Sequence, residues 1–166
     1  MNSDIYIRPA RLSDIPAITE IYNEAILSTT ATFDTDPKTV EDRTKWFSTH
    51  DERHPMIVAV ADDAVVGWAS LSAWSDRTAY DGTAETSFYV AESYRNRGIG
   101  RKLKQAIIDE AIRLGYHTLL ARVAEGSDIS LHLNKSFGFE TVGVMKQVGK
   151  KFGRLLDVHL LQKMLK

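Results

Sequence analysis

A short basic loop that contains two glycines, Arg95 to Gly100, separates a predicted strand from the longest helical pattern in the chain. The stretch before it, Thr83 to Ala91, has the residue pattern of a strand. The stretch after it, from about Gly98 to Leu114, carries apolar residues at helical spacing, and Gly115 closes the pattern. We therefore expect a strand that leads through a glycine loop into a long helix.

Strands and helices alternate along the rest of the chain. Ile5 and Ile7 suggest a first strand, and Ser13 and Pro16 suit the start of a helix, as a cap and a first-turn residue. Asp62-Asp63 joins two apolar stretches, which indicates a hairpin. The further predicted elements are helices from near Thr39 and over 128–137, the latter capped by Ser127, and strands over 56–61, 64–73, 117–123, 139–148 and 155–165. This order predicts a mixed α/β sheet covered by helices, in one domain over residues 1–166.

The composition is that of an ordinary globular protein, with 43% apolar and 26% charged residues among 166. The formal net charge of -1 gives no general attraction to nucleic acid or membrane. The absence of cysteine excludes disulfides, thiolate metal sites and a cysteine nucleophile. No signal-peptide pattern and no long apolar run occurs, so we expect a cytoplasmic protein. The histidines show no metal-ligand spacing, and we expect no metal.

The Arg95 to Gly100 loop has the properties of an anion site. Glycine lets the backbone approach a ligand closely. The first amides of a helix lack internal partners and lie at the positive end of the helix dipole. These features, with the surrounding arginines, predict a phosphate or pyrophosphate ligand. Neither the nucleotide P-loop pattern nor G-x-G-x-x-G is present. Taken alone, the loop is also compatible with a plain helix start that carries solvated basic residues.

The motifs on both sides of this loop resemble those of the GNAT N-acetyltransferases. Arg95, Gly98 and Gly100 fill the family pattern Q/R-x-x-G-x-G/A. The segment L-H-L-N-K-S-F-G-F (131–139) resembles the later helix of the family. Other segments resemble the phosphinothricin acetyltransferase branch, and within it the bacterial L-amino acid N-acyltransferases that take methionine sulfoximine and methionine sulfone: Y-N-E-A-I (22–26), W-S-D-R-T-A-Y-D-G-T-A-E (74–85) and K-F-G-R-L-L-D (151–157). The resemblance implies a single-domain GNAT fold, with a mixed, mostly antiparallel sheet of about seven strands and about four helices.

The resemblance also implies acetyl-CoA as the co-substrate. In the family, a splayed strand offers backbone hydrogen bonds to the pantetheine arm, and the loop amides hold the pyrophosphate. Ser127 stands where the family often has an asparagine that touches CoA. The backbone N–H of Val90 matches the group that polarises the thioester carbonyl. The residues implied to bind the co-substrate are Phe88, Tyr89, Val90, Arg95, Asn96, Arg97, Gly98, Ile99, Gly100, Arg101 and Ser127.

Acetyl transfer to an amine requires a base, because most amines are protonated at neutral pH and a protonated amine cannot attack a thioester. Glu85 stands at the position of the family's catalytic glutamate. From the residues alone, a solvent-facing strand carboxylate is the alternative. Asn134 stands where the family commonly has a tyrosine, or this branch a histidine, that protonates the departing thiolate. Asparagine can donate a hydrogen bond but cannot titrate, so the source of that proton is left open.

A free amino acid presents a carboxylate beside its amine, and a cation or paired donors must recognise it. By resemblance, Arg77 is the candidate cation, and Trp74, Tyr80 and Phe33 are candidate walls for the acceptor's side chain. The residues implied to bind the acceptor are Phe33, Trp74, Ser75, Asp76, Arg77, Tyr80, Glu85, Thr86 and Ser87, with Lys151 and Asp157 as residues that close the pocket. Because relatives are commonly dimers, we expect a homodimer.

The sequence therefore favours transfer of an acetyl group from acetyl-CoA to the α-amine of a small amino-acid-like molecule. Two alternatives stay open. The same fold could act on a protein N-terminus, a lysine or an aminoglycoside, although the aromatic and arginine-bearing Trp74 to Tyr80 segment argues against a polycation. Asn134 and Ser127 would also suit a non-catalytic module that only binds acyl-CoA.

Overall fold

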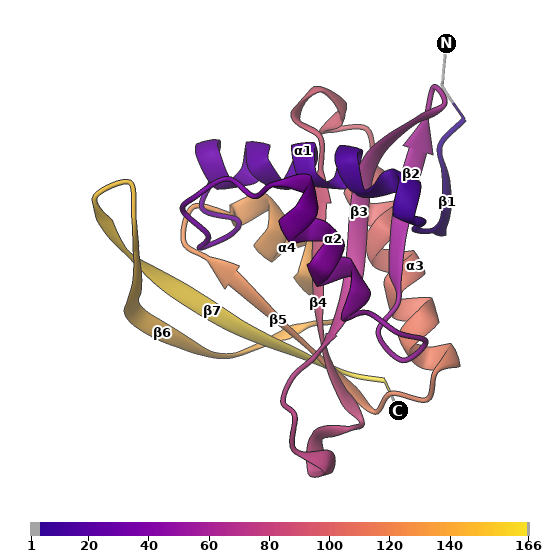
Figure 1. Ribbon diagram of the computed structural model, residues 1–166. Helices are drawn as coiled ribbons and strands as arrows, with labels where there is room; N and C mark the ends of the chain where they lie inside the picture. Colours follow the sequence, from indigo (N-terminus) through magenta and orange to yellow (C-terminus); the bar gives the residue numbers. More distant parts are fainter. Residues whose placement is uncertain (1–3, 166) are drawn as a thin grey trace.

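A seven-stranded sheet forms the centre of the computed structural model, which describes residues 4–165 (Figure 1). The strand order is β1-β2-β3-β4-β5-β7-β6, and every neighbouring pair is antiparallel except β4 and β5, which run parallel. The mixed, mostly antiparallel sheet predicted from the sequence is confirmed. The strands are β1 (Tyr6–Pro9), β2 (Met56–Ala61), β3 (Ala64–Ala73), β4 (Thr83–Val90), β5 (Thr118–Ala124), β6 (Glu140–Lys151) and β7 (Arg154–Met164).

Helices cover both faces of the sheet. In Figure 1, α1 and α2 lie in front of the strands, whereas α3 lies behind them. The four α-helices expected from the sequence are α1 (Ile15–Ser28), α2 (Val40–Ser48), α3 (Ile99–Arg113) and α4 (Asp128–Ser136), and three short 3-10 turns are η1 (Leu12–Asp14), η2 (Thr78–Tyr80) and η3 (Glu92–Tyr94). Among the described residues, no helix has both the length and the apolar character needed to cross a membrane.

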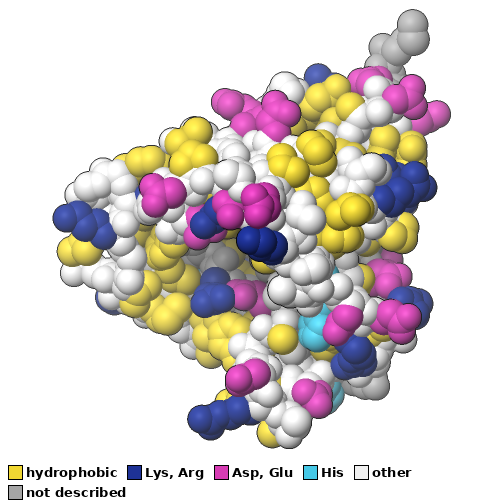
Figure 2. All heavy atoms as spheres, viewed as in Figure 1, with side chains coloured by type: hydrophobic (Ala, Val, Ile, Leu, Met, Phe, Trp, Pro, Cys, Tyr) yellow, Lys and Arg dark blue, Asp and Glu magenta, His cyan; other side chains and the backbone are white. Residues whose placement is uncertain are grey.

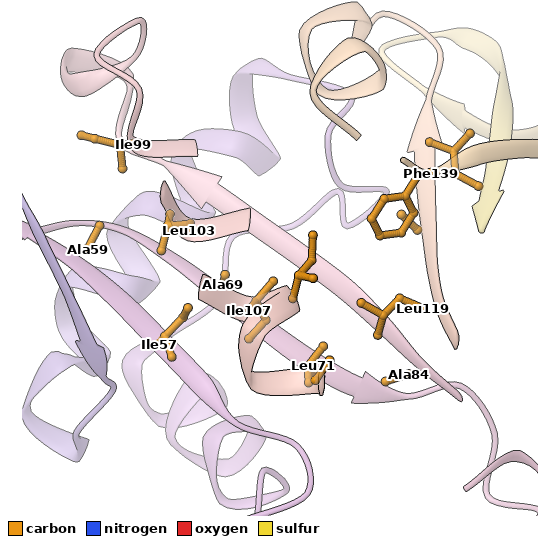
Figure 3. Packing of buried hydrophobic residues seen from close by; sticks show 14 of the residues in the cluster. Ile57, Ala59, Ala69, Leu71, Ala84, Ile99, Leu103, Ile107, Leu119 and Phe139 are labelled. Carbon is orange, nitrogen blue, oxygen red and sulfur yellow. The ribbon is translucent and has the colours of Figure 1, made fainter. Parts of the chain in front are cut away.

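The two sheet faces bury separate hydrophobic clusters. Behind the sheet, the inward side chains of α3, among them Leu103 and Ile107, pack on β2, β3 and β5 (Figure 3). In front, α1 and α2 cover Trp68 of β3. Alternate residues of β4 belong to different clusters, since Phe88 packs against the rear one and Tyr89 against the front one. Neighbouring residues of β4 therefore face opposite sides of the sheet, as the two-residue period of a strand requires.

Short residue patterns predicted most ends of the helices and strands correctly. Asp62 and Asp63 both have positive φ, 52° and 61°, as a two-residue hairpin turn requires. Thr39 caps α2, and its hydroxyl accepts a hydrogen bond from the Asp42 amide at 3.0 Å. The prediction of Ser13 as the first cap is wrong. Ser13 lies inside η1, and α1 begins at Ile15, because the Asp14 carboxylate fixes this turn by accepting from the Arg11 amide and pairing with Arg8.

Two features of the sheet create the site. The pairing of β4 with β5 covers only Thr83–Glu85 and Thr118–Leu120, so the two strands separate beyond Glu85. The long β6–β7 hairpin projects from the body of the protein on the same side as the opening between β4 and β5 (Figure 1). The sequence predicted the two strands but ended the first at Val148, whereas β6 continues to Lys151.

Candidate active site

A pocket of about 490 Å³ opens where β4 and β5 separate. Residues of both strands line it, together with the start of α3 and with α4. Figure 2 shows a hollow between the projecting hairpin and the helical body, with basic and acidic side chains at its edge. The sequence-predicted residues that line the pocket are Glu85, Thr86, Ser87, Phe88, Tyr89, Val90, Arg95, Asn96, Gly98, Ile99, Gly100, Arg101, Ser127 and Asn134.

The glycine loop has the backbone geometry of an anion site. Gly98 has a φ of 79° and precedes α3, whose first hydrogen bond runs from the Lys102 N–H to the Gly98 carbonyl at 3.1 Å. The amides of residues 99–101 therefore have no partner within the helix. A β-carbon at Gly100 would lie 3.2 Å from the Phe88 ring, so glycine allows the helix to start close to β4. This cradle fits the pyrophosphate of CoA.

The arginines around the loop are distributed unevenly. Arg101 reaches across to α4, where it donates to the Ser136 hydroxyl at 3.1 Å. The Arg95 Nε contacts the Val90 carbonyl at 3.4 Å. Arg97 instead lies over the Tyr94 ring, at 4.9 Å, and is not among the pocket-lining residues. Arg95 and Arg101 are thus the arginines of the loop region that line the pocket.

Glu85 is held by an arginine that sequence reasoning missed. Nε and Nη2 of Arg122 donate to the two carboxylate oxygens of Glu85 at 2.6 and 2.7 Å. These hydrogen bonds raise the pKa of the Arg122 guanidinium, and the Glu85 side chain is only 14% exposed. Arg122 also lies over the Trp74 ring at 5.5 Å. A lone arginine inside the apolar run T-L-L-A-R-V-A (118–124) was the available signal.

Asn134 of α4 and Ser127, which precedes the helix, make few contacts. Asn134 is 2% exposed, and its Nδ2 donates to the Ser130 carbonyl at 2.8 Å, while its buried Oδ1 has no partner among the described residues. Ser127 is the N-terminal residue that precedes α4, as predicted, but its side chain makes no capping hydrogen bond. Both side chains line the pocket. The Asn134 amide thus retains one acceptor atom that no described residue satisfies.

A lysine of α3 reaches the pocket from the core. Lys104 is 1% exposed, and its Nζ donates to the Thr86 hydroxyl oxygen at 2.7 Å. Burial lowers the pKa of this amine to about 7. Sequence reasoning also missed this residue, although Lys104 occupies the same helical stripe as Ile107, Ile108 and Ala111.

The other residues predicted to bind the acceptor lie outside the pocket. The Trp74 to Tyr80 loop contributes none of its residues to the lining, and Arg77 is exposed. Phe33 packs against Gly149 of the hairpin. Lys151 connects that hairpin to the segment that follows α1, because its buried Nζ donates to the carbonyls of Thr29 and Thr32, each at 2.8 Å. The predicted site residues that do not line the pocket are Phe33, Trp74, Ser75, Asp76, Arg77, Tyr80, Arg97, Lys151 and Asp157.

Comparison with known proteins yields one family. The profile of the acetyltransferase (GNAT) domain matches residues 7–160. The L-methionine sulfoximine/L-methionine sulfone acetyltransferase of Pseudomonas aeruginosa is 39% identical over 94% of this chain and 92% of its own. The phosphinothricin N-acetyltransferase of Streptomyces coelicolor is 36% identical over 94% of each chain.

A solved structure shares the whole architecture. The GNAT superfamily phosphinothricin acetyltransferase from Sinorhizobium meliloti, in complex with acetyl-CoA, superposes with a TM-score of 0.94 at 34% identity, over 97% of this chain and 88% of that one. The cradle at the start of α3 agrees with this co-substrate. The chain thus belongs to the GNAT acetyltransferase family and is an acetyl-CoA-dependent N-acyltransferase.

Proposed function

We propose that this enzyme transfers the acetyl group of acetyl-CoA to the α-amine of a small amino-acid-like acceptor, with Glu85 as the base. The relatives act, by name, on methionine sulfoximine, methionine sulfone and phosphinothricin, which are amino-acid-like molecules. L-Methionine sulfone, L-methionine sulfoximine, phosphinothricin and ordinary L-amino acids are accordingly the candidate acceptors.

The Glu85–Arg122 pair carries this proposal. The carboxylate and the guanidinium lie side by side in the pocket, at hydrogen-bond distance. The α-ammonium and α-carboxylate of an amino acid have the opposite arrangement of charges. Such an acceptor would replace the internal pair with two intermolecular pairs, its carboxylate on Arg122 and its amine on Glu85. A simple amine without a carboxylate would leave Arg122 unmatched.

The reaction then follows from the position of Glu85 on β4. The carboxylate takes a proton from the acceptor, directly or through water, and leaves a neutral amine that can attack the thioester. Glu85 is the last residue of β4 that pairs with β5, so it lies at the point where the strands separate. The backbone of Phe88, Tyr89 and Val90 lies beyond that point and would bind the pantetheine arm, with Val90 N–H polarising the carbonyl.

Two arginines, Arg77 and Arg122, are candidates to bind the carboxylate of the acceptor. Arg77 is exposed and lies outside the pocket, whereas Arg122 lines it beside Glu85. We propose Arg122 as the principal contact of the acceptor carboxylate, and Arg77 stays a prediction for the outer wall.

The test compares L-methionine sulfone with its analogue that lacks the α-carboxylate, measured by the release of free CoA thiol. The wild type should prefer the amino acid, and Arg122→Met should lose roughly 10- to 100-fold of kcat/KM for it, the loss expected when charge-assisted hydrogen bonds to the carboxylate are removed. Arg77→Met is the matched control. An unchanged preference in Arg122→Met would overturn this assignment, and transfer to lysine peptides alone would favour the protein-acceptor alternative.

The hairpin supports a proposal about assembly. Hydrophobic side chains lie exposed along it (Figure 2): Val142, Met145, Val148, Phe152 and Leu155 are each between 40% and 58% exposed. An apolar surface of this kind is typical of a protein interface. We propose that two copies of the chain associate through the hairpin as a homodimer. Sedimentation should show a dimer, and Val148→Glu should dissociate it.

A further inference from the structure

The departing CoA thiolate needs a proton, and Asn134 of α4 does not provide one. Asn134 cannot titrate, and its Nδ2 already donates to the Ser130 carbonyl at 2.8 Å. Its free Oδ1 is an acceptor. His132 also lines the pocket, but its side chain is exposed and lies on a different face of the helix from Asn134. A proton source on another wall of the pocket would be shielded from solvent, unlike His132.

Lys104 occupies the wall opposite Glu85. Glu85 and Thr86 are consecutive on β4 and face opposite sides of the sheet, Thr86 toward α3. They stand at the point where β4 and β5 separate, which the thioester must reach for Glu85 to act on its acceptor. The Glu85 carboxylate on one side of the sheet and the Thr86 hydroxyl, bonded to Lys104, on the other thus flank the place that the thioester must reach. Lys104, Thr86 and Glu85 all line the pocket.

The surroundings of Lys104 are apolar, and no carboxylate compensates its charge. Its Nζ lies 4.2 Å from the centre of the Phe139 ring and 5.9 Å from that of Phe88. Within residues 4–165, no salt bridge to Lys104 is formed. The other charged or titratable side chains that line the pocket with Lys104 are Glu85 and Tyr89 of β4, Tyr94 of η3, Arg95, Arg101 of α3, Arg122 of β5 and His132 of α4.

Burial is consequently the sole cause that lowers the pKa of Lys104, to about 7. An amine with this pKa is present in both protonation states near neutral pH, which suits a group that gives and regains a proton.

The hydrogen bond between Lys104 and Thr86 allows a proton to pass from the amine toward the hydroxyl. Nζ is the donor and Thr86 Oγ1 is the acceptor, so the hydroxyl hydrogen of Thr86 is free to donate elsewhere. We propose that Lys104 supplies the proton taken up by the CoA thiolate, and that the Thr86 hydroxyl relays it. This inference rests on the proposed acetyl transfer and adds a proton source to it.

The step balances without any further reactant. The acceptor nitrogen bonds to the carbonyl carbon, and the carbon–sulfur bond breaks with its electron pair on sulfur. Sulfur takes the hydroxyl proton of Thr86 while the Lys104 ammonium gives a proton to Thr86 Oγ1. The acceptor ammonium loses two protons in all: the first passes through Glu85 to solvent before the attack, and the second, lost as the amide forms, resides on Glu85. After the products leave, neutral Lys104 regains a proton from solvent.

The first test titrates the thiol of CoA bound to the enzyme, with no acceptor present, by the ultraviolet absorbance of the thiolate. A nearby ammonium favours the thiolate. Because the ammonium is present only up to its own pKa of about 7, the thiolate fraction of bound CoA at about pH 7 should be lower in Lys104→Met than in the wild type. Gln105→Met, an exposed position on the same helix, is the matched control and should equal the wild type.

The second test measures kcat against pH with L-methionine sulfone. Lys104→Met and Thr86→Val should each lose about 100-fold or more, the lower limit of general acid catalysis. In the wild type, kcat should decline as Lys104 loses its proton, and this decline should be absent in Lys104→Met. The double variant should be no slower than either single variant, because the two groups act as one unit.

The outcomes separate this inference from the proposed function. A thiolate fraction near pH 7 and a pH profile of kcat that are both unchanged in Lys104→Met, with acetyl transfer intact, would overturn the proton relay alone. Losses that multiply in the double variant would also overturn it. If the wild type acetylated no amine, the acetyl-transfer proposal would fail, whereas the thiol titration would still report on Lys104. Thr86→Val, which is isosteric, provides the second variant for either experiment.

Discussion

Replacing Lys104 with methionine should make the protein more stable at neutral pH, although the variant loses a hydrogen bond. The pKa of this amine falls from its ordinary value of 10.5 to about 7 in the fold, because the side chain is buried. Below pH 7 the amine is charged in both the folded and the unfolded chain, and the folded chain carries the cost of a buried charge. Methionine has a similar shape and no charge.

The size of this cost follows from the two pKa values. At about 1.4 kcal/mol per pH unit, the difference between 10.5 and about 7 corresponds to about 5 kcal/mol. The lost hydrogen bond to Thr86 offsets about 1 kcal/mol of this. The penalty is fully present below the folded pKa and is lost as pH rises toward the unfolded pKa, because between them only the unfolded chain is protonated.

Urea unfolding followed by tryptophan fluorescence measures the difference. At about pH 6, Lys104→Met should exceed the wild type by roughly 3–4 kcal/mol in free energy of unfolding. At about pH 9, where the penalty has fallen to about 2 kcal/mol, the same difference should be only about 1 kcal/mol. A variant that is less stable than the wild type at both pH values, by the same amount, would refute the reasoning. It would show that Lys104 stabilises the fold.

Four further substitutions test other parts of the site. Glu85→Gln should lower kcat by about 10²–10⁴-fold and leave the Kd for acetyl-CoA unchanged, as calorimetry can measure. Gly98→Ala should cost about 1 kcal/mol in urea unfolding, because its φ is 79°, and should weaken acetyl-CoA binding. Lys151→Met should cost about 1–3 kcal/mol in the same assay by leaving two carbonyls unpartnered. Gly149→Ala should displace the Phe33 ring, which a crystal structure would show; an undisturbed ring would contradict the packing described above.

Local chemistry accounts for the parts of the fold that the sequence predicted well. The Asp62-Asp63 turn, the Thr39 cap and the glycine loop depend on residues within a few positions of one another, so short patterns reveal them. The end of β6 was missed because its last residues, Gly149 to Lys151, are polar or lack a side chain. They are held by contacts with the distant Phe33 and Thr29.

Tertiary contacts explain what the sequence did not reveal about the site. Arg122 and Lys104 read as ordinary surface cations, and only the fold places one against Glu85 and the other under Thr86. Both interrupt apolar patterns, which is the signal that was available. The acceptor loop from Trp74 to Tyr80 was predicted by resemblance, and its place outside the pocket depends on a long connection that no local pattern fixes.

The most direct test of the proposed function is to incubate the wild-type enzyme with acetyl-CoA and L-methionine sulfone and to identify the product by mass spectrometry and NMR. The account predicts one N-acetylated product, modified at the α-amine, formed together with one equivalent of free CoA, and almost none with Glu85→Gln. Binding of acetyl-CoA without product from this acceptor or from any other L-amino acid would contradict it.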